Sequence, residues 1–320
     1  MRTAKLCCEP QSFPVVRDER PRTNRTPVWL VIAAFAAVYV IWGSTYLGIR
    51  LAIDSLPPLL MAGARFVIAG GILYPVMRML GAPRPQLVHW KSAFIIGTLL
   101  LLVGNGGVTW AQQTVPTSIA ALMVAATPLW INLIEWLRPN GRRPRRAVFI
   151  GLGIGFAGVA LIVLSKGSAG RGMLNPVGAG LLLLAPLCWA FGSIFSRHAA
   201  QTESALLNIA MQMLCGGALM LLAGLTAGEA SQFHIAQITP TSAWAFVYLT
   251  FVGSLVGFSA YVWLLQVSTP ARVSTYAYVN PFIAVLLGRL VLHETLPGSV
   301  LMAGACIIAA VVLITTSKAR

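Results

Sequence analysis

The chain has 320 residues, of which 57% are hydrophobic and 10% charged, and its formal net charge is +15. A soluble domain carries about 25% charged residues, so this composition excludes an ordinary soluble protein and indicates an integral membrane protein. Basic chains also include nucleic-acid-binding proteins, but here the Lys and Arg residues flank apolar segments, as orientation signals do, and we predict no nucleic-acid partner.

Residues 1–27 are basic, polar and rich in proline, and they lack the apolar core of a signal peptide. We interpret them as a disordered cytoplasmic tail. Ten apolar segments follow, each of about the length that crosses the hydrocarbon core of a bilayer. They are residues 28–50, 58–80, 90–111, 117–137, 147–165, 177–197, 205–226, 241–266, 270–292 and 298–316.

The basic residues favour one orientation of these ten segments. If the N-terminus is cytoplasmic, 18 of the 23 Lys and Arg residues fall on the cytoplasmic side and 4 on the other. Positive charge accumulates on the cytoplasmic side of membrane proteins. The sequence therefore predicts a multi-pass protein of the cell (inner) membrane with both termini in the cytoplasm.

The second half of the chain repeats the first. Shifting the sequence by 153 residues aligns identical residues at 13 of 58 positions between residues 102 and 159, without a gap. Five spans per repeat are an odd number, so the second copy is inserted upside down. We predict an all-α integral membrane fold of ten transmembrane helices in two inverted five-helix repeats, 28–165 and 177–316, an architecture whose binding site lies at the repeat interface.

The ninth segment contains the most unusual stretch, residues 275–281, in which tyrosines, a threonine and an asparagine precede Pro281. Proline removes a backbone donor, and in lipid such a break survives when protein or a polar cavity satisfies the freed groups. The repeat pairs Pro281 with Pro128, and two interrupted helices at corresponding positions indicate a binding site. The alternative is a packed kink in which Asn280 links neighbouring helices.

Aromatic and amide side chains supply the other candidates for substrate contact. Aromatic faces bind apolar groups and cations, and amides form hydrogen bonds without net charge. Aromatic residues near span ends are otherwise interface anchors. The predicted substrate-binding residues are Trp42, Asn105, Trp189, Tyr276, Tyr278 and Asn280.

Three arginines and one glutamate carry charge in or beside the spans. Arg65 lies seven residues inside the second span, where a cation is costly. With Arg50 and Arg289 it would attract an anionic group, such as an amino-acid carboxylate; the alternative for those two is contact with lipid headgroups. For Arg65 we favour a structural or gating role, together with the helix breaks at Pro128 and Pro281. Glu135 is a candidate proton site, but its place near a span end favours an ordinary surface glutamate.

Several segments resemble the EamA-type transporters of the drug/metabolite transporter superfamily, in particular the bacterial YedA-like group. The resemblance covers about residues 28–316 and is carried by IWGSTYLGIR at 41–50, PPLLMAGARF at 57–66, VGNGGVTW at 103–110, WAFGS at 189–193 and YAYVNP at 276–281. It implies export of amino acids, other metabolites, sugars or toxic cations. The family pattern also implies an acidic residue after the fourth span of each half. Glu294 fits this pattern, whereas the aligned position in the first half is Gly141.

We therefore predict a secondary transporter that exports a small metabolite, such as an amino acid, by alternating access. The alternative is a non-transporting scaffold or a receptor for an envelope partner. No HExxH, P-loop or GxSxG motif and no His/Cys cluster with metal spacing occurs, so we predict neither an enzyme nor a cofactor. The expected partners are a small-molecule substrate and the lipid bilayer, and a homodimer is left open.

Overall fold

The computed structural model describes residues 27–138, 146–164, 175–268, 273, 275–294 and 297–317. The side chains at 162–164, 277, 278, 314, 315 and 317 lie outside this description. The same holds for the predicted tail, apart from Pro27, and for Gly141.

The described residues form helices and connecting turns, without a strand. In the first half the elements are α1 (Val28–Ala52), α2 (Pro58–Met79), α3 (Leu87–Gly97), η1 (Thr98–Gly106), α4 (Gly107–Ala111), α5 (Thr117–Val124), α6 (Thr127–Leu137) and α7 (Arg146–Leu164). In the second half they are α8 (Pro176–Phe195), α9 (Ala205–Thr226), η2 (Glu229–Gln232), η3 (Ile235–Gln237), α10 (Pro240–Tyr248), η4 (Leu249–Phe258), α11 (Ser259–Val267), α13 (Tyr276–Leu292) and α14 (Gly298–Ser317).

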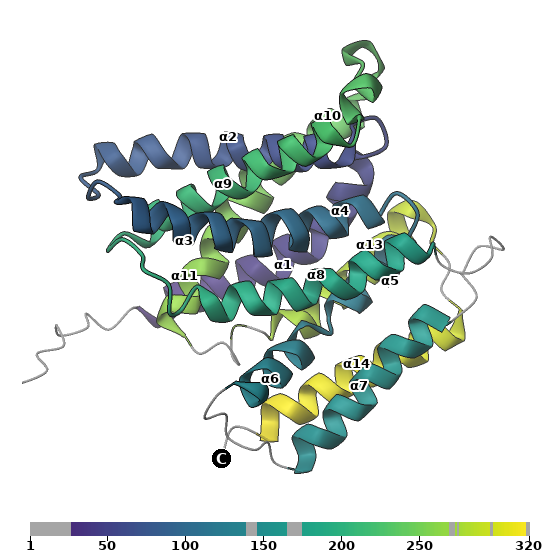
Figure 1. Ribbon diagram of the computed structural model, residues 1–320. Helices are drawn as coiled ribbons and strands as arrows, with labels where there is room; N and C mark the ends of the chain where they lie inside the picture. The colour runs from purple at the N-terminus through teal and green to yellow at the C-terminus, as the bar shows by residue number, and fades with distance from the viewer. Residues whose placement is uncertain are drawn as a thin grey trace, which may run out of the picture.

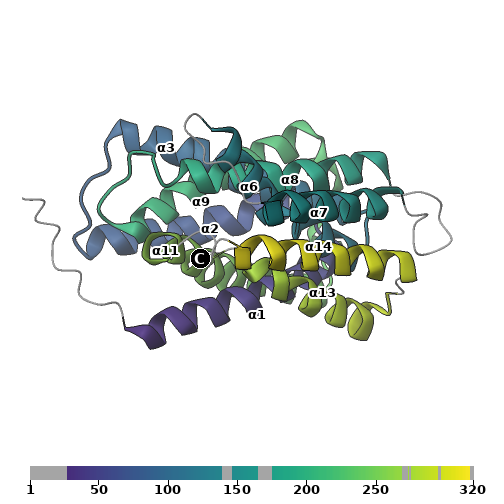
Figure 2. The ribbon, with the colours of Figure 1, turned by 90° about the horizontal axis from the view of Figure 1, so that it is seen from below.

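Seven helical stretches of the described chain are long and apolar enough to cross a membrane. Some of them join consecutive elements, as α3, η1 and α4 do over Leu87–Ala111. Three shorter apolar helices accompany them, at Arg146–Leu161, Val279–Leu292 and Gly298–Leu313. The prediction of an all-helical membrane protein is confirmed, and the long axes of the helices run in broadly the same direction (Figures 1 and 2).

Glycines allow a close helix crossing between α2 and α9. A Cβ atom on Gly63 would lie 2.7 Å from the backbone nitrogen of Leu221, and one on Gly217 would lie 2.8 Å from that of Val67. Contacts this short leave no room for a side chain. Small residues at helix crossings in membranes let the two backbones approach and gain van der Waals contact.

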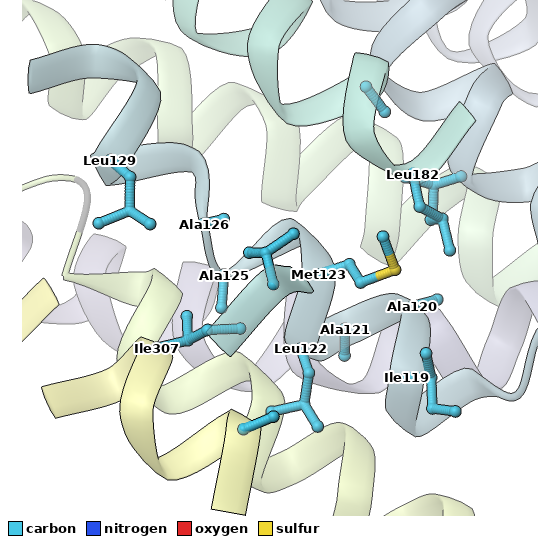
Figure 3. Close-up of a cluster of buried hydrophobic side chains, with 14 of the residues drawn as sticks. Ile119, Ala120, Ala121, Leu122, Met123, Ala125, Ala126, Leu129, Leu182 and Ile307 are labelled. Atoms are coloured by element: carbon cyan, nitrogen blue, oxygen red, sulfur yellow. The ribbon is translucent and has the colours of Figure 1, made fainter. Parts of the chain in front are cut away.

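Helices α7 and α14 lie side by side at one flank of the bundle (Figures 1 and 2). Their apolar side chains join those of α5 and α6 in the largest buried cluster, where Ile307 of α14 lies near Leu122 and Leu129 (Figure 3). Close packing of these side chains excludes lipid and water from the space between the helices. The cluster thus attaches the α7–α14 pair to the helices that surround the cavity described below.

Candidate functional site

A cavity lies between helices of both halves of the chain. It offers about 70 Å³ to the centres of water-sized molecules, several times the roughly 10–15 Å³ that one water needs, so a small organic molecule fits. Its wall is formed by Trp42, Thr45, Tyr46 and Ile49 of α1, Arg65 and Phe66 of α2, Leu101, Gly104 and Asn105 of η1, Val108 of α4, Val124 of α5, Ala185, Pro186 and Trp189 of α8, Gly253, Ser254 and Phe258 of η4, and Tyr276 and Asn280 of α13.

Most of the side chains predicted for the site lie together in this wall. Of the six predicted substrate-binding residues, Trp42, Asn105, Trp189, Tyr276 and Asn280 line the cavity, and so does Arg65. The sixth, Tyr278, belongs to α13, but its side chain lies outside the described part of the structure. Whether these residues contact a substrate stays a prediction.

Four aromatic rings from α1, α8, α11 and α13 form one cluster against the cavity. Trp42 is its centre, with ring centroids 5.5 Å from Trp189, 4.7 Å from Tyr261 and 5.3 Å from Tyr276. The contacts to Trp189 and Tyr276 are edge-to-face, at interplanar angles of 86° and 85°. This geometry is favourable for aromatic pairs, and the cluster gives the cavity a rigid apolar side.

Tyr261 fixes the orientation of this cluster from behind the cavity wall. Its hydroxyl accepts a hydrogen bond from Trp189 Nε1 at 3.0 Å and lies 2.8 Å from the hydroxyl of Ser193. Because Ser193 donates its own proton to the carbonyl of Trp189 at 2.7 Å, Tyr261 donates to Ser193. The tyrosine is 2% exposed, and its hydroxyl holds the Trp189 indole in one rotamer.

Arg65 contributes the charge of the wall. It is 2% exposed, and its Nη2 donates to Oδ1 of Asn105. Thr109 supports Asn105 by donating to its backbone carbonyl at 2.9 Å. Arg65 thus faces the protein interior, whereas Arg289 is exposed, Arg50 is half-buried, and neither of these two lines the cavity.

Asn280 connects α13 to α1. When its amide nitrogen faces the nearby acceptors, Nδ2 donates to the carbonyl oxygens of Tyr39 at 3.1 Å and Tyr276 at 3.2 Å. A second link joins the same helices, because the hydroxyls of Tyr39 and Thr275 lie 2.5 Å apart. Asn280 is 4% exposed, so this amide both ties two helices together and faces the cavity.

Two of the composite helices that face the cavity, Leu87–Ala111 and Pro240–Val267, contain a π-helical segment. η1 ends at Gly106, next to Asn105, and η4 ends at Phe258. A π-helix widens the helix and commonly occurs at functional sites. In η4 the carbonyl of Leu249 accepts a hydrogen bond from the hydroxyl of Ser254 at 3.0 Å.

The two predicted helix breaks differ. Near Pro128 the helix is interrupted as expected, since α5 ends at Val124 and α6 begins at Thr127, whose hydroxyl donates to the Val124 carbonyl at 2.7 Å. At Pro281 we expected a break, but α13 runs through this residue. The helix begins only five residues earlier, so the proline costs it a single backbone hydrogen bond. Neither proline lines the cavity, and neither does Glu135, whose proton role stays a prediction.

Sequence reasoning did not select several residues of the wall: Thr45, Tyr46, Phe66, Ser254 and Phe258. Thr45 and Tyr46 stand within the 41–50 segment, so their helical spacing from Trp42 was an available signal. The others look like ordinary apolar or small residues of a span, and only the packing of the helices brings them to the cavity.

Known proteins resemble this chain over most of its length. The EamA-like transporter family matches the chain twice, over residues 28–164 and 176–316. The chain belongs to the EamA-like transporter family. This confirms the resemblance to EamA-type transporters predicted from the sequence, including the YedA-like group: the chain is 39% identical over 290 residues to the uncharacterized inner membrane transporter YedA of Escherichia coli K12, covering 90% of this chain and 91% of the relative.

Relatives with lower sequence identity to this EamA-like chain carry different functional names. It is 26% identical over 292 residues to a probable amino-acid metabolite efflux pump of Salmonella typhimurium, covering 85% of this chain and 90% of the relative. It is 27% identical to protein PecM of Dickeya dadantii, covering 86% and 88%. A protein of known crystal structure is 19% identical in sequence to this chain and matches it with a TM-score of 0.63. The match covers 91% of this chain and 99% of that protein, which shows a shared fold.

Proposed function

We propose that this EamA-like protein is a secondary transporter that exports a small metabolite, an amino acid or a similar compound, across the cytoplasmic membrane by alternating access. The observation that carries the proposal is the cavity between α1, α2, η1, α8, η4 and α13, which combines an aromatic wall with Arg65, Asn105 and Asn280. Small-molecule sites are concave, mostly apolar and oriented by a few polar groups. The names of the efflux-pump relatives agree with an exported amino-acid metabolite.

The same proposal includes ten spans in two inverted repeats, 28–165 and 177–316, with both termini in the cytoplasm. The helix packing supports the repeat. Helix α1 packs on α13 and η4, and its counterpart α8 packs on α5 and η1. The pairs α2–α9, α5–α13 and α7–α14 each join a helix to its own counterpart. These contacts are those expected of two copies related by a two-fold axis, and such copies alternate access by rocking around a central site.

A transport assay tests the function directly. The purified protein is reconstituted in liposomes loaded with labelled amino acids, sugars or polyamines, and release is compared with protein-free liposomes. We expect saturable release of a compound from the panel. Absence of protein-dependent release across the panel would contradict export of such metabolites. It would favour the alternative of a scaffold or a receptor for an envelope partner.

Orientation is tested separately in intact cells. The five native cysteines are first replaced by serine. One cysteine is then placed either in the N-terminal tail or in the loop between α7 and α8, and each variant is treated with a membrane-impermeant maleimide. We expect labelling of the loop cysteine alone, since the positive charge predicts a cytoplasmic tail. Labelling of the tail cysteine would contradict the proposed topology.

A further inference from the structure

We propose that Arg65 binds a carboxylate of the transported molecule, so that the substrate is a carboxylate-bearing compound with an apolar portion. This inference rests on the proposed function, because it assigns the substrate class of the same cavity. It changes the sequence-based view of Arg65, which favoured a structural or gating role because no facing partner could be identified.

The first argument is the charge balance of the cavity. Among the described residues, Arg65 is the one charged side chain in the wall, and no Asp or Glu lies there to neutralise it. The side chain is 2% exposed and starts from the eighth residue of α2, which is long and apolar enough to cross a membrane. A buried cation without a counter-charge is costly, and one inside a membrane protein marks a functional site.

The second argument is the unused hydrogen-bonding capacity of the guanidinium. Within the described chain Arg65 makes one side-chain hydrogen bond, from Nη2 to Asn105, and its buried Nε has no partner. A guanidinium has five N–H donors in a planar fork that matches the two oxygens of a carboxylate. A neutral amide such as Asn105 satisfies one donor and leaves the charge uncompensated. A ligand carboxylate would supply both the missing acceptors and the missing charge.

The third argument is the opposite character of the rest of the wall. Trp42, Trp189 and Tyr276 present aromatic surface to the same cavity, and Phe66 lies beneath the guanidinium, 4.6 Å from its central carbon to the ring centroid. An apolar group packs on such surface while its acidic end reaches the arginine. Amino acids with apolar side chains and aromatic or aliphatic carboxylic acids have this chemistry.

The competing explanation is that Arg65 only holds Asn105 in η1. Asn105→Asp separates the two ideas, because it places a carboxylate of the protein against the guanidinium. If Arg65 is structural, the new ion pair preserves the fold, and the wild-type protein already binds an acid no more tightly than its amide. If Arg65 binds the ligand, the carboxylate introduced by Asn105→Asp pairs with the guanidinium. Ligands with a carboxylate then no longer bind more tightly than their amides.

The experiment measures binding and flux with matched probes. Thermal unfolding of the purified wild-type protein is followed with L-phenylalanine, L-leucine and 3-phenylpropanoate, each against its own primary amide, since a ligand that binds the folded state raises the melting temperature. Flux of labelled L-phenylalanine, L-leucine and their primary amides is measured in liposomes against protein-free liposomes. Arg65→Gln removes the positive charge of the side chain. Arg65→Lys keeps the positive charge but lacks the planar fork of N–H donors, and Asn105→Asp places a carboxylate of the protein against the guanidinium.

We expect the acids to bind at least about tenfold more tightly than their amides, the factor that corresponds to one hydrogen bond with a charged group. We expect this preference to disappear in Arg65→Gln and Asn105→Asp and to weaken in Arg65→Lys. Asn105→Asp is the variant expected to fold even if Arg65→Gln does not. Equal binding of acids and amides, unchanged preference in Asn105→Asp, or no stabilisation by any of the acids would overturn the carboxylate site. Flux of amides as fast as acids would do the same while leaving transport itself intact. Binding of the acids without any flux would instead contradict the transporter function and preserve the site.

Discussion

Glu294 and Ser118 are joined by two hydrogen bonds across 176 residues of sequence, since the carboxylate of Glu294 accepts from the backbone N–H of Ser118 at 3.1 Å and from its hydroxyl at 2.5 Å. The other carboxylate oxygen accepts from the backbone N–H of Thr117 at 2.8 Å. Glu294 thereby caps the N-terminus of α5. The free N–H groups of a helix start attract an acceptor, and a negative charge there interacts favourably with the helix dipole.

A second glutamate repeats this arrangement. Glu229 accepts from the backbone N–H groups of Leu59 at 3.2 Å and Leu60 at 2.9 Å, at the start of α2. Each glutamate directly follows a residue in the left-handed conformation, Gly228 or His293, that ends a helix of the second half. The turn after α9 or α13 therefore directs an acid onto a helix of the first half. The two caps fasten the halves of the chain at the same end of the bundle.

Removal of the Glu294 cap is expected to destabilise the protein. Glu294→Ala leaves the first N–H groups of α5 without their acceptor, which costs about 0.5–2 kcal/mol for a helix cap. The measurement is thermal unfolding in detergent, with Glu203→Ala, at an exposed position, as the matched control. Equal melting temperatures of the two variants would show that the cap contributes nothing.

Gly217 is expected not to tolerate a methyl group. In Gly217→Ala the Cβ would lie 2.8 Å from the backbone nitrogen of Val67, so α2 and α9 must move apart and lose contact along their whole crossing. Overpacking of this kind costs about 1–3 kcal/mol. Gly71→Ala on α2 is the control, because its Cβ would meet nothing within 4 Å. Unfolding midpoints in detergent compare the two, and an unaffected Gly217→Ala would contradict the close crossing.

Tyr261→Phe is expected to loosen the aromatic wall without removing a ring. The change deletes the hydroxyl that bonds both Trp189 and Ser193, and one such hydrogen bond contributes about 0.5–1.5 kcal/mol to stability. Stability and transport flux should both fall, and the tryptophan fluorescence should change. Tyr74→Phe is the control, since that ring packs on Trp90 at 5.8 Å away from the cavity. A wild-type flux in Tyr261→Phe would argue against a role of Trp189 orientation.

Asn280→Ala and Tyr278→Ala are expected to reduce flux while folded protein is still obtained. For Asn280 the reason is the loss of a cavity-facing amide that also bridges α1 and α13. One such neutral hydrogen bond contributes about 1 kcal/mol, so the fold survives its removal. Flux is measured per amount of monodisperse protein in liposomes. Wild-type flux in both variants would remove these residues from the site.

The sequence by itself determined the membrane class and the family, and it selected six of the residues that line the cavity. Apolar length, charge asymmetry and the placement of Asn280, Trp42 and Arg65 within apolar spans are properties of local composition, and polar groups in lipid need an interior destination. The helix break predicted at Pro281 is absent, because a proline near the start of a helix is tolerated.

The tertiary structure alone decided which groups meet. The tertiary structure joins Arg65 to Asn105, places the Tyr261 hydroxyl behind Trp189, and brings Glu229 and Glu294 to their helix starts. Each of these contacts joins residues at least 40 positions apart in the sequence. Such contacts depend on how closely the backbones cross, at glycines such as Gly217, and on the angle at which each helix enters the bundle. Those quantities result from the packing of all helices together, and no single segment specifies them.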